Sequence, residues 1–213
     1  MTKISVVDYG IGNIKSICSA LEKSDADIVL TDNRREILSS HGLILPGVGA
    51  FAHGMEKLIS KKLDKIINDF VTTGKPLLGI CLGMQMLFEK SSEFGDTPGL
   101  GLIPGEVLRL QSNKNVSEKL PFVSWSGTKP PENQSWSNTI LNGINCNDHM
   151  YFVHSYYAKP KDKENVLSVT EYSDKDYCST VKRGNVYGCQ YHPEKSADKG
   201  LKIINNFVEI CRG

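Results

Sequence analysis

The segment Pro76-Leu-Leu-Gly-Ile-Cys-Leu-Gly-Met-Gln85 decides the fold. Its apolar first half, Pro76–Ile80, predicts a buried strand, and the pattern over Gly83–Lys90 predicts a helix. The glycines two residues before and two residues after Cys81 permit a sharp turn between these elements. A nucleophilic side chain between two such glycines, at a strand-to-helix junction, forms a nucleophile elbow. The elbow lifts that side chain above the carboxyl edge of a sheet, where open α/β proteins place their sites.

Strand and helix patterns alternate on the N-terminal side of this segment. Short apolar runs predict strands at Ile4–Val7, Asp27–Leu30 and Gly42–Leu45. Helical spacing of apolar residues predicts helices over Asn13–Lys23 and Arg34–Ser39, and one long helix whose apolar stripe runs from Met55 to Phe70. Short, continuous apolar strands between helices are typical of a parallel sheet that is covered on both faces.

Beyond about Ser91 the chain becomes rich in strands. Before a closing helix over Ala197–Cys211, further strands are predicted at Glu106–Leu110, Phe122–Trp125, Tyr151–His154, Val166–Glu171, Cys178–Lys182 and Val186–Tyr191. The tight turn Arg183-Gly184-Asn185 indicates an antiparallel pair. The expected fold is therefore α/β: a three-layer sandwich with a mostly parallel central sheet, helices on both faces and an added antiparallel part. No linker is long enough to divide the chain, so one domain over residues 1–213 is expected.

The composition narrows the class of protein. The chain has 213 residues and a formal net charge of +1, from 25 Lys and Arg against 24 Asp and Glu. This balance argues against an extended surface for nucleic acid or for an anionic membrane, so neither is expected as a partner. No stretch reaches the ~18 apolar residues that span a bilayer, and the N-terminus lacks the pattern of a leader peptide. A cytoplasmic location is expected.

The six cysteines are scattered, without a Cys-x-x-Cys pair. Apart from Cys81, we interpret them as small apolar filler in a reducing compartment. Cys189 and His192 are close in sequence, but no further ligand has zinc spacing, so no metal site is expected. The turn at Gly10-Ile11-Gly12 resembles the start of a dinucleotide-binding fingerprint, but Lys15 stands in place of the third glycine. A tight strand-to-helix turn explains these glycines, and no cofactor is expected.

A thiolate nucleophile needs a base that also protonates the leaving group. His192 and Glu194, in Gln190-Tyr-His-Pro-Glu194, face the same side if the chain is extended, and Pro193 biases His192 toward that conformation. Glu194 can then orient the imidazole and stabilise its charged form, which is the role of the third residue in a catalytic triad. The remaining histidines in polar or turn contexts are expected at the surface: His41, His53 and His149.

Backbone N–H groups near Cys81 can bind an oxyanion. The predicted helix leaves the N–H of Leu82 without a helical partner and directs its positive end at the sulfur, which favours the thiolate. The turn formed by Gly47, Val48 and Gly49 follows another strand, at the same edge of a parallel sheet, and its glycines allow N–H groups to point inward. An ordinary strand-to-loop turn is the alternative for this second segment.

Segments 46–49, 79–85 and 190–196 together resemble the class I, triad-type glutamine amidotransferases. Within this family, the segments 8–13 (Asp-Tyr-Gly-Ile-Gly-Asn), 45–51 and 151–156 resemble the glutaminase subunits of imidazole glycerol phosphate synthases. The resemblance covers essentially the whole chain, in order and at similar spacing. Each segment alone is weak evidence, but the combination is specific.

The resemblance implies that Cys81, His192 and Glu194 hydrolyse L-glutamine to glutamate and ammonia through a glutamyl thioester. It implies an oxyanion site at the Gly47–Gly49 turn and the N–H of Leu82. Further residues match positions that line the substrate pocket: Gln85, Glu93, His154 and Ser155. The ammonia would pass, within a heterodimer, to a (β/α)8-barrel cyclase subunit that forms imidazole glycerol phosphate and an aminoimidazole ribonucleotide in histidine biosynthesis. Asn13 and Trp125 match positions at the interface with that partner.

One segment departs from the family pattern. Pro121-Phe-Val-Ser-Trp-Ser126 stands where the family usually has Pro-His-x-Gly-Trp-Asn, beside the partner interface. The chemistry at Cys81 is not affected, but the identity of the partner stays open. Related glutaminases supply ammonia to sugar amidotransferases of bacterial surface polysaccharide biosynthesis, which is the main alternative. A stand-alone cysteine hydrolase on the same fold, such as a γ-glutamyl hydrolase, and an interaction module without activity are the others.

Overall fold

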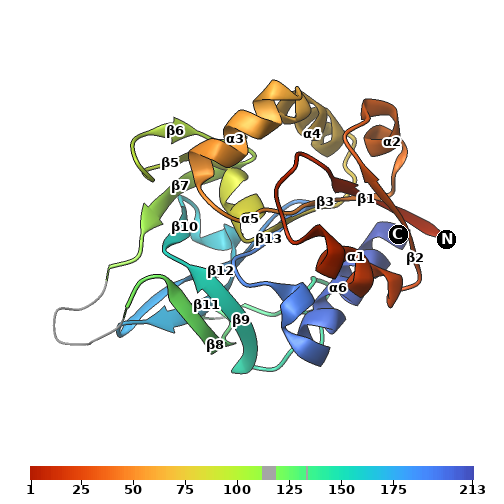
Figure 1. The fold of residues 1–213 in the computed structure, drawn as a ribbon. Coiled ribbons are helices and arrows are strands. Elements are labelled where there is room, and N and C mark those ends of the chain that lie inside the picture. The colour runs from red at the N-terminus through yellow and green to blue at the C-terminus, as the bar shows by residue number, and fades with distance from the viewer. Residues whose placement is uncertain (112–118, 133) are drawn as a thin grey trace.

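A seven-stranded mixed sheet forms the centre of the protein (Figure 1). The structure is a computed structural model that describes residues 1–111, 119–132 and 134–213. In spatial order the strands are β11 (Val166–Tyr172), β12 (Lys175–Arg183), β13 (Val186–Cys189), β4 (Leu77–Ile80), β3 (Gly42–Leu45), β1 (Thr2–Val7) and β2 (Ala26–Thr31). Strands β13 to β2 are parallel, and β12 and β11 extend them in antiparallel fashion. The expected mostly parallel sheet with an antiparallel addition is confirmed.

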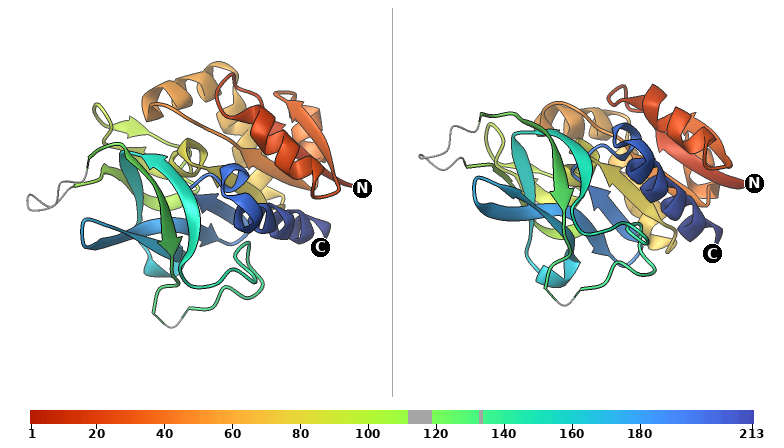
Figure 2. Two further views of the ribbon diagram at one scale, coloured as in Figure 1. Left: turned by 60° about the horizontal axis from the view of Figure 1, so that its bottom comes forward. Right: turned by 90° about the horizontal axis from the view of Figure 1, so that it is seen from below.

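Helices cover both faces of this sheet (Figures 1 and 2). One face packs against α1 (Ile14–Glu22) and α6 (Ala197–Arg212), and the other against α2 (Arg34–Ser39), α3 (Phe51–Ser60), α4 (Leu63–Thr72) and α5 (Leu82–Met86). Alternate residues of one strand enter opposite clusters: Ile44 lies in the first, and Leu43 and Leu45 lie in the second. Burial on both faces explains why the strands are continuous apolar runs. Across the described ranges, no helix is long and apolar enough to cross a membrane.

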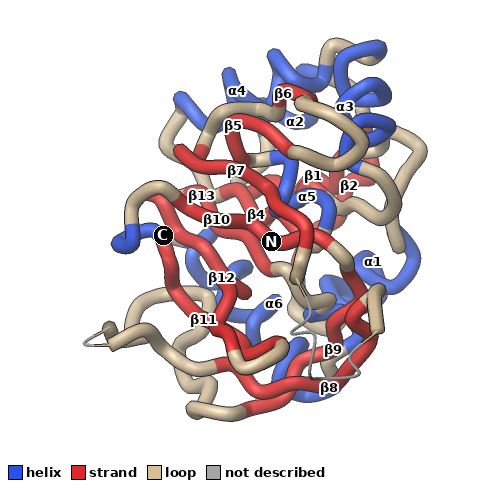
Figure 3. Tube along the Cα trace, turned by 90° about the vertical axis from the view of Figure 1, so that its left-hand side faces the viewer, coloured by secondary structure: helices blue, strands red, loops and turns tan. Residues whose placement is uncertain are grey.

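Two smaller sheets (Figure 3) and two single 3₁₀ turns complete the part of the chain that the structure describes. The four-stranded sheet has the order β10 (Tyr156–Pro160), β7 (Ile103–Arg109), β5 (Phe88–Ser91) and β6 (Thr97–Pro98), and the ribbon pairs β8 (Phe122–Thr128) with β9 (Asp148–His154). The 3₁₀ turns are η1 (Lys163–Asn165) and η2 (Pro193–Lys195). The sequence did not predict β6 or β10.

The helix predicted over Gly83–Lys90 is wrong beyond Met86. The chain turns at Leu87, whose carbonyl accepts hydrogen bonds from the N–H groups of Leu102 (2.9 Å) and Ile103 (3.0 Å). Phe88–Ser91 then pairs in parallel with β7 as strand β5. Pairing with a distant strand therefore overrides a local helical pattern in this short segment.

The single long helix predicted over Met55–Phe70 is also wrong, because it is interrupted at Lys62. This residue has a left-handed backbone conformation (φ 58°), which separates α3 from α4. Each helix then buries its own apolar face, whereas Ile59, which a single stripe would bury, is 55% exposed. The periodicity identified the helical residues but not the break between them.

The carboxyl ends of β1, β3, β4 and β13 meet at one edge of the central sheet. Register pairs Leu45 of β3 with Gly79 of β4, and Ile80 of β4 with Cys189 of β13. The segments that follow these strands therefore lie side by side above the sheet. They contain all the triad residues predicted from the sequence.

Candidate active site

Cys81 occupies a strained turn between β4 and α5. Its backbone has φ 54° and ψ −110°, a conformation that side chains other than glycine rarely adopt. The Cys81 N–H donates to the carbonyl of Cys189 (2.7 Å), and the Cys81 carbonyl accepts from the N–H of Gln85 (3.1 Å). Such backbone strain costs about 1–3 kcal/mol and is typical of active sites. The predicted nucleophile elbow is present.

The glycines around Cys81 are required by close packing. A Cβ at Gly83 would overlap the carbonyl oxygen of Leu45, and a Cβ at Gly79 would lie 2.8 Å from the backbone of Gly83. Gly47 also packs on this turn, because a Cβ there would lie 2.8 Å from the Gly83 nitrogen. Gly47 is therefore buried against α5, and the pocket is lined by the next two residues of its loop, Val48 and Gly49.

His192 and Glu194 form a buried hydrogen-bonded pair. The distance from Nδ1 of His192 to Oε1 of Glu194 is 2.8 Å, and the two side chains are 2% and 0% exposed. His192 is extended, as predicted, but Glu194 reaches it through the 3₁₀ turn η2 and not through an extended chain. Burial disfavours the imidazolium, but the Cys81 sulfur and the Glu194 carboxylate favour it and together raise the pKa of His192 to about 10.

One pocket brings these groups together with most of the other predicted residues. The cavity has a volume of about 270 Å³, and its lining includes Cys81 and His192. The predicted residues that also line it are Val48, Gly49, Leu82, Gln85, Glu93, His154 and Ser155. Pro121, Val153 and Tyr156 complete the wall, although the sequence did not single them out. Nε2 of His192 and Oε2 of Glu194 are buried without a hydrogen-bond partner among the described residues.

Hydrogen bonds within the protein already occupy polar atoms of the Glu93 and His154 side chains. Oε2 of Glu93 accepts a hydrogen bond from the N–H of Phe51 (2.6 Å) and caps the start of α3. The His154 ring lies 2.9 Å from the carbonyl of Tyr156 through Nδ1 and 3.1 Å from the Tyr177 hydroxyl through Nε2. Burial, with the nearby charge of His192, lowers the pKa of His154 to about 4, although the bond to Tyr156 opposes this. His154 is therefore a neutral part of the wall.

Two buried glutamine side chains connect the pocket wall with the sulfur. Nε2 of Gln85 donates to the carbonyl of Tyr156 (2.9 Å) and to Oε1 of Gln190 (3.0 Å). Nε2 of Gln190 lies 3.8 Å from Sγ of Cys81, within the range of a hydrogen bond to sulfur. Sequence reasoning missed Gln190, although it lies two residues before His192 on the same face of the extended segment.

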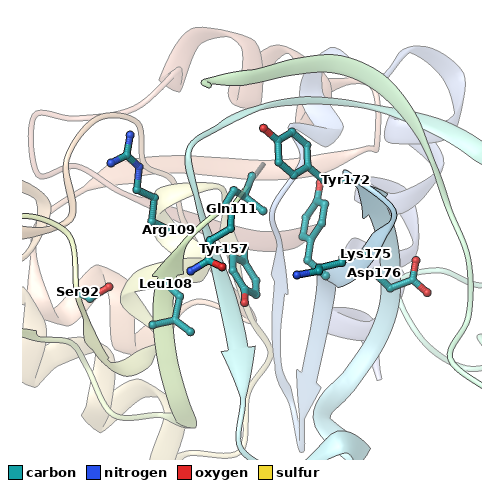
Figure 4. A pocket seen from close by; sticks show the side chains of 10 residues that line it. Ser92, Leu108, Arg109, Gln111, Tyr157, Tyr172, Lys175 and Asp176 are labelled. Carbon is teal, nitrogen blue, oxygen red and sulfur yellow. The ribbon is translucent and has the colours of Figure 1, made fainter. Parts of the chain in front are cut away.

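The structure has a second cavity, whose lining includes residues of β7, β10 and β12 (Figure 4). Its volume is about 350 Å³, and Tyr177 belongs to its lining and bonds to His154 of the first pocket. Its other walls include Arg109, Tyr157 and Lys175, as Figure 4 shows. None of the predicted site residues lines this second cavity.

The residues predicted at a partner interface lie on two separate segments, β8 and the turn before α1. Trp125 on β8 is 50% exposed, and its ring packs against Tyr151 at 5.9 Å between centroids. Nδ2 of Asn13 lies 3.5 Å from Oε1 of Glu194, which joins the segment after β1 to the triad. A glycine-rich turn precedes Asn13, with positive φ at Gly10 and Gly12, as expected of a tight strand-to-helix turn.

The other histidines and cysteines follow the predictions with one exception. His41, His53 and His149 are exposed as predicted. All the cysteines are free thiols, and Cys178, Cys189 and Cys211 are buried filler. Cys146 is exposed, which contradicts the prediction that it fills the core. Within the described ranges, no group of three or more His, Cys, Asp and Glu side chains is placed to hold a metal ion.

NMR titration is expected to distinguish the two buried histidines. Both would titrate near pH 6.5 in an unfolded chain, whereas His192 is expected to keep its proton to about pH 10 and His154 to stay neutral to about pH 4. Imidazole resonances would be recorded across this range, with His154→Gln to assign the signals. A midpoint near 6.5 for either residue in the folded protein would contradict this assignment.

The pKa shifts of His154 and His192 make the free energy of unfolding depend on pH in opposite directions. Below pH 6.5 the unfolded chain gains a proton at His154 that the folded protein does not, which costs up to about 3 kcal/mol by pH 4. The stabilisation that charged His192 provides is complete below pH 6.5 and is lost as the pH rises toward 10. Unfolding experiments at several pH values measure both trends.

Comparison with known proteins agrees with this geometry. The family model "Glutamine amidotransferase class-I" matches residues 5–211. "Imidazole glycerol phosphate synthase subunit HisH 1" of Legionella pneumophila (strain Lens) is 43% identical over 213 residues, covering 99% of this chain and 100% of that protein. The HisH subunit of Bacillus cytotoxicus is 46% identical over 211 residues, covering 98% of this chain and 95% of that protein.

Solved structures support the fold alone. A crystal structure of a glutamine amidotransferase superimposes with a TM-score of 0.74 at 17% identity, over 99% of each chain. The structure of PurLQS from Thermotoga maritima gives a TM-score of 0.70 at 21% identity, over 98% of each chain. With a family model across residues 5–211 and relatives above 40% identity over nearly the full length, the chain belongs to the class I glutamine amidotransferases and, within them, to the HisH family of imidazole glycerol phosphate synthase glutaminase subunits.

Proposed function

We propose that this chain hydrolyses L-glutamine to glutamate and ammonia, as one subunit of a heterodimer with a (β/α)8-barrel cyclase. The cyclase would combine the ammonia with its own substrate to form imidazole glycerol phosphate and an aminoimidazole ribonucleotide in histidine biosynthesis. The main support is the pocket lined by Cys81 and His192, with His192 held by the buried Glu194 carboxylate, in a chain of the HisH family. The free thiols suit a reducing compartment, so we place the reaction in the cytoplasm.

The geometry supports a reaction in two steps at Cys81. The thiolate attacks the side-chain amide carbon of glutamine, and a C–S bond forms. The His192 imidazolium gives its proton to the amide nitrogen, the C–N bond breaks, and ammonia leaves behind a glutamyl thioester. Water then attacks the thioester and gives a proton to neutral His192, the C–S bond breaks, and glutamate is released. Glu194 holds the imidazole through Nδ1 during both steps.

Backbone groups next to Cys81 stabilise the negative oxygen of each tetrahedral intermediate. Leu82 provides the first N–H of α5, which has no partner within the helix. The neighbouring loop contributes Val48 and Gly49 to the pocket wall, and Gly49 has φ 95°. In this role Gly47 acts as the small residue that lets the loop approach α5, and the next two residues face the substrate.

Side chains of the pocket fit the amino-acid end of glutamine. Both N–H groups of the Gln85 amide are used within the protein, so its Oε1 remains to accept a hydrogen bond from the substrate. Glu93 uses Oε2 at the start of α3, and its second oxygen remains for a positively charged α-amino group. Ser155 and the neutral His154 imidazole complete this end of the pocket.

The segment that departs from the family pattern supports the cyclase as partner. Along β8, Val123 and Trp125 are 56% and 50% exposed, whereas the departing residues alternate with them and are half-buried on the other face: Phe122, Ser124 and Ser126. Phe122 packs against Tyr172, with 5.1 Å between ring centroids, and Ser126 donates to Ser124 (3.1 Å). The substitutions therefore alter the inner face and leave the docking face unchanged, so the polysaccharide alternative loses its support.

Added cyclase subunit is expected to increase glutaminase turnover strongly over that of the isolated chain. Trp125→Ala is expected to weaken binding of the cyclase about 30-fold, because a buried aromatic anchor is worth ~2 kcal/mol at an interface. Titration of the cyclase, followed through glutamate release and calorimetry, measures both effects. Leu30→Ala is the matched control, since Leu30 is an exposed apolar residue on β2 at the far edge of the sheet.

Two experimental outcomes would contradict this proposal and support a different function. Steady hydrolysis by the isolated chain at the rate of the mixture would make it a stand-alone hydrolase. Absence of hydrolysis in a stable complex would make it an interaction module without activity. Unchanged affinity in Trp125→Ala would remove that residue from the interface while leaving the chemistry intact.

A further inference from the structure

The orientation of the Gln190 amide is determined by a backbone carbonyl. The Tyr156 carbonyl can only accept hydrogen bonds, so the Gln85 amide must present its NH₂ group there. The same NH₂ group also reaches Gln190, which must therefore present its oxygen to Gln85. The remaining group of the Gln190 amide is its own NH₂, and this group faces Sγ of Cys81 at 3.8 Å.

The position of Gln190 is fixed independently of the pocket contents. Its side chain is fully buried, and its backbone N–H donates to the carbonyl of Ser179 on β12 (2.9 Å). The Cys81 N–H bonds to Cys189, the residue before Gln190. The end of β13 therefore holds both the backbone of the nucleophile and the amide beside its sulfur.

We propose that Gln190 is a positioning residue for the nucleophile: its amide N–H donates to the Cys81 sulfur and aims it at the substrate, in an orientation imposed through Gln85 by the Tyr156 carbonyl. This inference deepens the proposed glutaminase reaction and rests on it. A hydrogen bond to sulfur becomes stronger when the sulfur ionises, because the acceptor is then charged. The amide does not ionise in the pH range of the experiment, so it stabilises the thiolate without exchanging a proton with His192.

The same contact links substrate binding to the nucleophile. Gln85 lines the pocket with its free Oε1 and bonds to Gln190 through Nε2. Glutamine that binds Oε1 therefore also restrains the amide beside the sulfur. The connection needs no movement of the backbone, since all of its groups are already in contact.

The test measures alkylation of Cys81 by iodoacetamide in the full-length chain as a function of pH, by mass spectrometry of the Cys81 peptide. Gln190→Met has similar length but no N–H donor, and its alkylation at neutral pH is expected to be about 10-fold slower or more, with the profile moved to higher pH. Among the described residues, His192 and Tyr9 are the titratable groups with an electrostatic interaction with Cys81. Burial raises the pKa of Tyr9 far above its ordinary value, so of these two only His192 exchanges a proton in the range tested.

The controls separate this inference from the proposed reaction. Gln111→Met changes an exposed glutamine and is expected to leave the profile unchanged. If Gln190→Met does not fold, as thermal unfolding would show, Gln190→Leu tests the same loss of a donor. A wild-type alkylation profile in a folded variant without the amide overturns the role of Gln190, even if the wild-type complex hydrolyses glutamine. Absence of glutamine hydrolysis by the wild-type complex overturns the proposed function, whatever the alkylation profile.

Discussion

Cys81→Ala is expected to reduce glutamine hydrolysis in the complex with the cyclase on the order of 10⁴-fold or more. The variant has no atom that can form the thioester, and the backbone groups around the elbow cannot replace it. Glutamate release with excess cyclase measures the loss. Cys146→Ala is the matched control, because that thiol is exposed and is expected to leave turnover unchanged.

The fold is expected to survive this substitution. Alanine has the same Cβ at φ 54°, so the backbone strain is similar in the variant and the wild type. Cys81→Gly removes the Cβ and is expected to be about 1 kcal/mol more stable than Cys81→Ala, while equally inactive. Chemical denaturation compares the two variants. Wild-type hydrolysis by a folded Cys81→Ala protein would exclude Cys81 as the nucleophile.

His192→Asn is expected to lower turnover about 10³-fold or more, because no imidazolium is then present to stabilise the thiolate and to protonate the departing amide nitrogen. Asparagine is the informative substitution, since its amide N–H can take the place of Nδ1. The Glu194 carboxylate, which is 0% exposed, then keeps its hydrogen bond in the variant. Loss of activity would therefore not result from an unpaired buried charge.

The control for this prediction is His53→Asn, at an exposed position on α3. Its turnover is expected to equal that of the wild type. Alkylation of Cys81 is expected to slow in His192→Asn but not in His53→Asn, since only His192 lies beside the sulfur. Turnover within tenfold of the wild type in His192→Asn would mean that another group acts as the base.

The sequence predicted the central sheet well because its strands are buried on both faces. A run such as Gly42–Leu45 has no polar position, and its pattern does not also suit an amphipathic helix. Phe88–Ser91 was misread because its two end residues are buried and its two middle residues exposed, a pattern that also suits a helix. Its partner, β7, lies more than ten residues further along the chain, and periodicity contains no information on such pairing.

The candidate site was predicted where one short segment determines the geometry. Glycines two residues before and two residues after Cys81 permit a tight turn, and Pro193 keeps Glu194 close to His192, although through a 3₁₀ turn. Gln190 was missed because its role depends on Gln85 and on a backbone carbonyl from β10. Contacts between segments about 35 to 110 residues apart cannot be derived from spacing within one segment.

The pairing of β4 with β13 has a consequence for synthesis of the chain. The ribosome completes the thiol-bearing turn long before it reaches Val186, where β13 begins. Until that last strand emerges, the nascent polypeptide has neither the imidazole nor the carbonyl of Cys189 that anchors the turn. A chain that lacks β13 therefore cannot hydrolyse glutamine, so incomplete copies without this strand release no ammonia.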